Sequence, residues 1–160
     1  MKRLKNRIIA FLRQGMTPHD LALALALGVA LGTFPVIGAT SLLCGAASIL
    51  LRLNLPTIQS INWAVSPLQL MLLIPLFKLG SKVFGGNAVT VSFNALMTMM
   101  QTDLIGTIGA FLVVTLHGIG AWALMAPPAA AFMYFLALPV IARVQLQYER
   151  IRFDESSEQP

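Results

Sequence analysis

Four uncharged polar residues lie within one apolar stretch of the sequence, and their spacing makes them the best candidates for binding. Gln59, Asn62, Ser66 and Gln69 are three, four and three residues apart, which places them along one face of a helix. Amide and hydroxyl groups in apolar surroundings need hydrogen-bond partners. These side chains therefore either line a polar path for the headgroup of a substrate or join neighbouring helices to each other. The residues alone leave both interpretations open.

Groups that could carry out covalent chemistry are scarce. The sequence shows no nucleophile with a base nearby, no cluster of metal ligands and no phosphate-binding loop. Cys44 is the only cysteine, and His117 is the only group within 104–142 that titrates near neutral pH. We interpret both as packing residues. We predict that the protein is not an enzyme and that it holds no metal and no cofactor.

The composition indicates which elements position these residues. Of the side chains, 57% are hydrophobic and only 11% are charged, with a mean hydropathy of +0.78, whereas soluble domains carry about a quarter charged residues. Three blocks, 21–51, 53–77 and 104–142, contain no Asp, Glu, Lys or Arg. Each is longer than the ~18 apolar residues that mark a membrane segment. The sequence predicts an all-α membrane protein built from helical hairpins.

The net charge of +5 arises at one end of the chain. Five of the 11 Lys and Arg side chains lie within the first 13 residues, and the rest of the chain is balanced. A short basic segment is attracted to anionic lipid on the cytoplasmic side of a membrane, whereas nucleic-acid binding needs a basic face on a folded domain. We predict a basic surface segment at 1–15, membrane lipids as partners and no binding of nucleic acid.

The first block is too long for one crossing, and its centre, residues 32–40, reads GTFPVIGAT. A helix capped by Thr17 should begin near residue 18. It should stop before Pro35, because the residue preceding a proline avoids helical geometry. Each of the two resulting limbs is about 21 Å long, short of the ~30 Å hydrocarbon core. Residues 18–52 are therefore predicted to form a re-entrant hairpin.

The tip of this hairpin is predicted from its turn-forming residues. Gly38 permits a turn of the backbone, and Thr40 or Ser41 is expected to cap the second limb. Helix ends at such a tip either pack as a plain turn or receive a polar headgroup, as broken helices in transporters do. Gly28 and Gly32 form a small-xxx-small pair that should let helices pack closely. The predicted tip comprises Phe34, Pro35, Gly38 and Thr40.

The second and third blocks are also predicted to fold back on themselves. Pro67 divides a hairpin at about 56–82, and Pro127-Pro128 divide another at about 104–143. Three hairpins would bring every basic cluster to one side, which satisfies the positive-inside rule with both termini cytoplasmic. A single crossing by 56–82 is the alternative, and it would carry the basic residues at its end to the other side.

The remaining segments are predicted to lie at the membrane surface or beyond it. Residues 88–101 separate polar from apolar side chains as an interfacial amphipathic helix does. Residues 147–160 form a polar tail whose last six residues are expected to be disordered. The three hairpins are assigned to a single membrane domain, residues 16–146. Trp63, in the second block, is interpreted as a packing residue, with an aromatic at the membrane interface as the alternative.

Three stretches carry a resemblance to a known family. They read GMTPHDLALALALGVALGTFPVIGATSLL at 15–43, LRLNLPTIQSINWAVSPLQ at 51–69 and FKLG at 77–80. The sequence resembles the bacterial integral membrane family catalogued as domain of unknown function 2062. This resemblance implies a multi-pass protein of the bacterial inner membrane. Some relatives carry a glycosyltransferase domain on the same chain, which implies work on glycans or lipids of the cell envelope.

Two functions follow as expectations. The first is a transporter-like module that moves or presents an amphipathic envelope molecule, such as a lipid-linked one. The alternative is a non-transporting membrane helper or anchor for an envelope glycosyltransferase or a similar enzyme. The partner would then be that enzyme or another membrane protein, and a homo-oligomer is a further option. The absence of Asp, Glu, Lys and Arg from the apolar blocks disfavours strong proton coupling.

Overall fold

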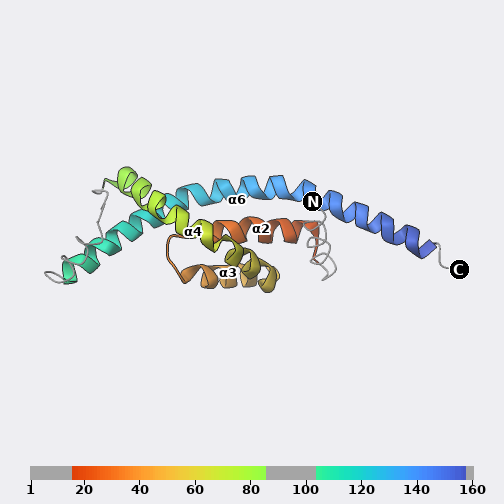
Figure 1. The fold of residues 1–160 in the computed structure, drawn as a ribbon, viewed down its shortest axis with the longest axis horizontal. Helices are drawn as coiled ribbons and strands as arrows, with labels where there is room; N and C mark the ends of the chain where they lie inside the picture. Colours follow the sequence, from red (N-terminus) through yellow and green to blue (C-terminus); the bar gives the residue numbers. More distant parts are fainter. Residues whose placement is uncertain (1–15, 86–103, 158–160) are drawn as a thin grey trace.

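The computed structural model describes residues 16–85 and 104–157, with side chains up to residue 148, and these residues form four α-helices (Figure 1). α2 and α3 lie side by side as a short hairpin, and α4 and α6 are longer helices that pass along it. No strand occurs in the described ranges, so the all-helical prediction is confirmed for them. The helices are α2 (Pro18–Gly32), α3 (Ala39–Leu50), α4 (Leu55–Phe84) and α6 (Leu104–Ser157).

The start of α2 follows from its capping residues. The Thr17 hydroxyl accepts the backbone N–H of Asp20 at 3.1 Å, and the Asp20 carboxylate accepts the Thr17 hydroxyl at 2.7 Å. Pro18 occupies the first helical position, where its missing N–H costs nothing. The predicted start is confirmed. The helix ends at Gly32, before Pro35, as the sequence also predicts.

The second limb begins differently from the prediction. Gly38 is the N-cap of α3, with a left-handed φ of +89° that favours glycine, and no side chain caps the helix. The prediction that Thr40 or Ser41 caps this limb is therefore wrong. The turn at Gly38 lets the helix start at Ala39, so Thr40 already lies in its first turn and is buried.

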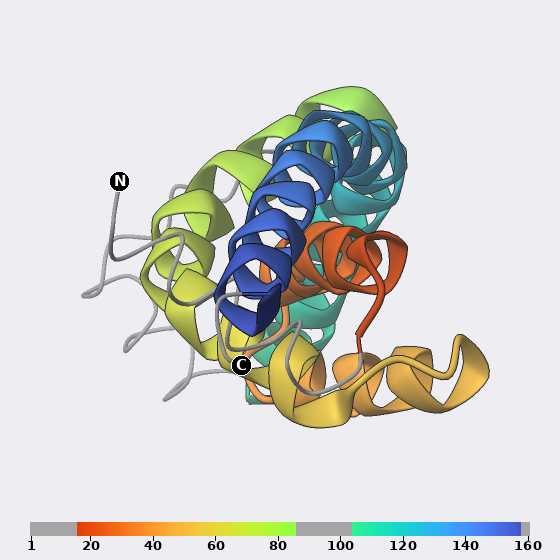
Figure 2. The same ribbon diagram turned by 90° about the vertical axis from the view of Figure 1, so that its right-hand side faces the viewer.

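α2 is the central helix of the described structure. It contacts all three of the others, and Figure 2 shows it between α3, α4 and α6. The alternation of Leu with Ala in its sequence matches this position, because small residues face neighbours on several sides. No residue from 21 to 32 is exposed. The residues buried in this helix are Leu21, Ala22, Ala24, Ala26, Gly28, Ala30 and Gly32.

α4 runs unbroken through Pro67 and Pro75, so the predicted hairpin at 56–82 is wrong. A single buried stripe explains why the helix continues. Its members are four or seven residues apart, which keeps one helical face on α2 and α6 across both prolines. This packing outweighs the hydrogen bond that each proline removes. The stripe consists of Ile58, Asn62, Gln69, Leu76 and Gly80.

α6 is likewise one helix, and the predicted hairpin at 104–143 is wrong. It arches along α4 and α2 and extends past both (Figure 1). The prolines inside α4 and α6 all lie on exposed faces, so the disturbed backbone faces away from the packed interior. They are Pro67, Pro75, Pro127, Pro128 and Pro139.

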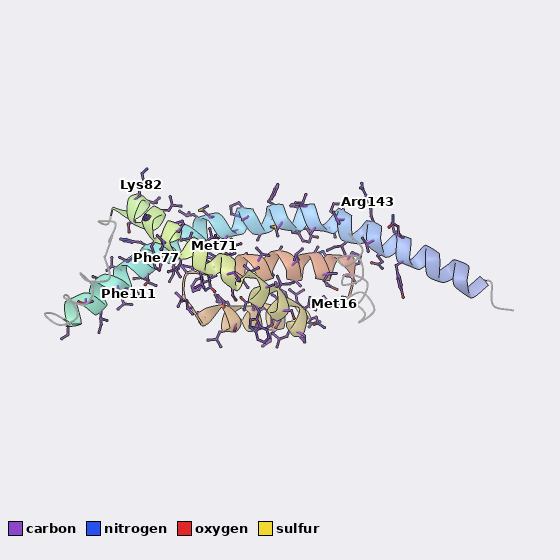
Figure 3. All side chains as sticks on the ribbon, viewed as in Figure 1. Met16, Met71, Phe77, Lys82, Phe111 and Arg143 are labelled. Atoms are coloured by element: carbon purple, nitrogen blue, oxygen red, sulfur yellow. The ribbon has the colours of Figure 1, made fainter. Side chains whose placement is uncertain are left out.

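The unbroken α4 also changes how the basic residues are arranged. Its two ends, near Arg52 and at Lys82, lie at opposite ends of the bundle (Figures 1 and 3). The prediction that all basic clusters gather at one side is therefore wrong for the end of α4. The start of α2 and the C-terminal part of α6 lie at the same end (Figure 1).

Three further segments were predicted from the sequence: a basic segment, an amphipathic helix and a polar tail. The basic segment 1–15 and the amphipathic helix 88–101 lie outside the described residues. The polar tail predicted at 147–160 is not a separate segment at its start, because α6 continues to Ser157. The expected disorder from residue 155 is therefore wrong for 155–157.

Many large apolar side chains are exposed in this structure, and several polar side chains are buried. α3 buries Thr40, Cys44 and Ser48 on one face, while Leu42 and Ile49 on the other are 77% and 79% exposed. Large apolar side chains are exposed along α4 and α6 as well. Two helices are long and apolar enough to cross a membrane, Leu55–Phe84 and Ile105–Tyr148. Only 17% and 11% of their most apolar stretches are buried, which distinguishes them from core helices of a soluble protein.

Candidate functional site

The tip of the α2–α3 hairpin ends against the middle of α4. The Gln69 side-chain amide donates to the carbonyl of Phe34 at 2.8 Å. Gln69 and Pro35 are both buried, whereas Ile37 and Gly38 on the outer side of the tip are exposed. The backbone of the turn therefore obtains a partner from α4 where no helical partner is available. Sequence reasoning placed Gln69 and the tip in separate candidate sets, and the structure brings them together.

Trp122 of α6 joins the same region and was missed by the sequence analysis. Its indole N–H donates to the carbonyl of Ala30 at 3.0 Å, and its ring meets Phe34 edge-on with centroids 4.9 Å apart. The Ala30 carbonyl also accepts the hydroxyl of Thr33 at 2.8 Å. Trp122 is half-buried, and a tryptophan removed from water usually needs an acceptor for its N–H. This rule predicts that Trp122 has a hydrogen-bond acceptor, but it does not predict which carbonyl near the end of α2 is that acceptor.

The other members of the polar stripe have different roles. The Gln59 amide donates to the hydroxyl of Ser41 at 2.8 Å and so ties α4 to α3. The hydroxyl of Ser66 lies 3.4 Å from the carbonyl of Asn62 within α4 itself. Asn62 is only 2% exposed and is the most deeply buried amide of the stripe. Two of the four predicted residues, Gln59 and Gln69, thus bind the hairpin directly.

The two glycines predicted for helix packing lie where α2 meets α4. A Cβ at Gly28 would stand 2.7 Å from the side chain of Ile61, and one at Gly32 would stand 3.1 Å from the amide oxygen of Asn62. The nearest atoms at both glycines belong to α4 rather than to α3. Gly32 therefore makes room for the Asn62 amide against the last turn of α2.

Together these contacts form a polar centre, which we define as Gln69, Asn62, Trp122 and the carbonyls of Ala30 and Phe34. The negative end of α2 and the positive end of α3 also meet at this tip. All of these side chains are uncharged, so the centre offers hydrogen bonds and dipoles rather than acid–base groups. Among the described residues no group of His, Cys, Asp and Glu could hold a metal ion.

Trp63 lies outside this centre, and its interpretation as a packing residue is wrong. Its side chain is 67% exposed on α4. The reason is positional, because the buried stripe passes through Asn62 and leaves the next residue on the outer face.

A close helix crossing lies at the other end of α4 and was also missed. A Cβ on Gly80 would overlap the carbonyl of His117 on α6. The His117 ring stacks on Phe84 with centroids 5.9 Å apart, and its Nδ1 is buried without a partner in the described residues. This arrangement agrees with the interpretation of His117 as a packing residue but leaves one ring nitrogen without a hydrogen bond in the described residues. Gly118 supports the crossing by accommodating the ring of Phe77.

A third contact ties the first turn of α2 to the middle of α6. His19 Nδ1 and the Tyr134 hydroxyl are 2.7 Å apart, and the two rings meet edge-on. No spacing rule connects residues so far apart in sequence, so only the fold reveals this pair.

Comparison with known proteins gives one family. The family model described as "Uncharacterized protein conserved in bacteria (DUF2062)" matches residues 1–150. No curated protein and no solved structure matches the chain.

Proposed function

The chain belongs to this bacterial family, DUF2062, and from that premise we propose that it is a transporter-like module of the bacterial inner membrane that moves or presents an amphipathic, lipid-linked envelope molecule. The module consists of two crossing helices, α4 and α6, and a re-entrant hairpin formed by α2 and α3. The polar centre at the hairpin tip is the part that receives the polar group of the cargo.

Membrane insertion is supported by the many exposed apolar side chains. Exposed side chains such as Leu42, Ile49 and Met71 are 74–79% exposed. Each would cost free energy in water of about 25 cal/mol per Å² of apolar surface. In hydrocarbon the same surface has no such cost. The buried polar residues Thr40, Asn62 and Gln69 then face protein instead of lipid.

The re-entrant arrangement is supported by helix lengths. α4 is about 45 Å long and spans the bilayer with some tilt. α2 and α3, with 15 and 12 residues, reach only about 22 and 18 Å. If Leu55 lies at the cytoplasmic boundary, Gln69 and the tip that it holds lie about 21 Å along α4, inside the hydrocarbon core. α6 returns to the starting side, so the start of α2 and the C-terminal part of α6 are both cytoplasmic.

The observation that carries the proposal is the polar centre at this depth. Broken helix ends and uncharged hydrogen-bonding groups inside the bilayer are the features that transporters use to bind polar groups. Without such a use, Asn62 and Gln69 would be replaceable by apolar side chains of similar volume at little cost.

The proposal is tested with purified protein in liposomes that contain a fluorescent lipid in both leaflets. Reduction of the outer label by dithionite measures exchange between leaflets. Protein-free liposomes should lose about half of the signal, and liposomes with the protein should lose more. Asn62→Leu should abolish the additional loss while the protein stays folded. Ser60→Ala is the matched control, since this hydroxyl bonds only to the Pro56 carbonyl of its own helix and is exposed.

A second candidate function is favoured by the same hydrogen bonds. Gln59 and Gln69 are already engaged with the hairpin, as expected of residues that hold a helper or anchor together. The partner would then be an envelope glycosyltransferase or a similar membrane enzyme. Lipid exchange equal to that of protein-free liposomes, together with co-purification of such an enzyme with both the wild type and Asn62→Leu, would favour this candidate.

A further inference from the structure

Two lysines lie at the end of α4 that is remote from the start of α2. Lys78 and Lys82 are one helical turn apart on the same face, and both are exposed. Figure 3 shows Lys82 pointing away from the neighbouring helices, with Met16 at the opposite end of the bundle. The only carboxylate among the described side chains is Asp20, and it accepts the hydroxyl of Thr17 beside Met16. The lysine pair therefore has no carboxylate partner in the described part of the chain.

The direction of these lysines is fixed by the helix crossing. Gly80 and Ser81 face α6 and are buried, and Gly80 approaches the His117 backbone too closely for any rotation of α4. Lys78 and Lys82 must therefore project from the opposite side of the helix. On that side lies Ile74, which is 61% exposed one turn below Lys78.

The position of the pair along α4 matches the phosphate layer of a membrane. At 1.5 Å per residue, Lys78 and Lys82 lie about 35 and 41 Å from Leu55. The hydrocarbon core is about 30 Å thick and the whole bilayer about 40–45 Å. A helix that enters at Leu55 thus brings both ammonium groups to the headgroups of the opposite leaflet.

We propose that Lys78 and Lys82 bind the phosphate of an anionic phospholipid in the leaflet opposite the start of α2. This inference rests on the proposed function, because it requires α4 to cross the bilayer, and it names the class of lipid that the module contacts at that side. A lipid is favoured over free phosphate because the apolar side chain one turn below Lys78, Ile74, is 61% exposed and can pack on an acyl chain. Free phosphate would leave that surface unused.

The test measures lipid preference with the full chain in detergent. Native mass spectrometry compares retention of phosphatidylglycerol with that of phosphatidylcholine. Each lysine near a phosphate should raise the affinity for the anionic lipid by about fivefold. With two lysines, the wild type should prefer phosphatidylglycerol by roughly 30-fold. Lys78→Gln/Lys82→Gln should lose this preference, and Lys78→Arg/Lys82→Arg should keep it. The matched control is Arg52→Gln/Arg143→Gln, which removes two exposed charges elsewhere and should also keep it.

Three results would overturn the inference. The first is a preference that survives in Lys78→Gln/Lys82→Gln, and the second is an equal loss in Arg52→Gln/Arg143→Gln. The third is displacement of the lipid by inorganic phosphate at equal concentration, which would identify a site for free phosphate. The measurement does not depend on lipid exchange. A protein with the preference but without exchange would refute the proposed function alone, and exchange without the preference would refute this inference alone.

Discussion

Replacing Gly80 with alanine should force α4 away from α6, because the added Cβ would overlap the carbonyl of His117. The added Cβ and the His117 carbonyl oxygen would be at least ~1 Å closer than two such atoms in ordinary van der Waals contact. A backbone carbonyl cannot rotate aside as a flexible side chain can. Overpacking of this kind costs about 1–3 kcal/mol. A gap of about 1 Å along the remaining contact also forfeits up to half of its dispersion energy. We expect a loss of about 2–3 kcal/mol, or about 5–10 °C in Tm.

The assay uses Cys44, which is the only cysteine and is fully buried. Its reaction with a fluorogenic maleimide during heating reports unfolding of the purified protein. Gly45→Ala is the matched control, because its Cβ would meet nothing within 4 Å and its helix propensity should rise by about 1 kcal/mol. Size-exclusion chromatography after heating checks that the signal reflects more than local opening of α3. A Gly80→Ala protein that melts with the wild type would refute the close crossing.

Further predictions concern the hairpin and the lipid-facing surface. Trp122→Phe retains an aromatic ring but loses the bond to Ala30, so Tm should fall by about 2–4 °C for about 1 kcal/mol; an unchanged Tm would mean that this bond contributes nothing. Gly38→Ala should cost about 1–2 kcal/mol because of the positive φ, and a stability equal to that of the wild type would contradict the turn. In a Trp122→Phe background, Trp63 emission should be quenched by brominated acyl chains in liposomes and not by aqueous iodide; the reverse would contradict exposure of α4 to lipid.

Local signals in the sequence were sufficient for the first hairpin. Thr17, Pro18 and Asp20 define a helix start through bonds within four residues, and Pro35 with Gly38 defines a break in the same way. Such features are independent of the rest of the fold. The all-helical class followed from the long uncharged blocks, which exceed the length of any strand.

The prolines of α4 and α6 show where local signals fail. Pro67 weakens a helix whether or not a hairpin follows. Whether the helix continues past Pro67 depends on whether the residues before and after it are buried on a common face. Ile58, Asn62 and Leu76 are buried in this way. The spacing of these residues is visible in the sequence. Whether their burial outweighs the destabilising effect of the proline depends on packing against α2 and α6.

The candidate site was predictable in part for the same reason. The spacing of Gln59, Asn62 and Gln69 correctly indicated one stripe, whereas the partners of Gln59 and Gln69 lie 18 and 35 positions away in sequence. The two tryptophans are equally apolar in sequence context, and only packing separates the half-buried Trp122 from the exposed Trp63. Long-range pairs of this kind require the fold.

The most direct test of the central claim, that α4 crosses the membrane once beside a re-entrant hairpin, is labelling of single cysteines in spheroplasts. On a Cys44→Ala background, Arg52→Cys places a thiol just before the start of α4, and Lys82→Cys places one in its last turn. A membrane-impermeant maleimide should label Lys82→Cys in intact spheroplasts and Arg52→Cys only after disruption. Labelling of both in intact spheroplasts, or of neither before disruption, would place the two ends of α4 on the same side and contradict the account.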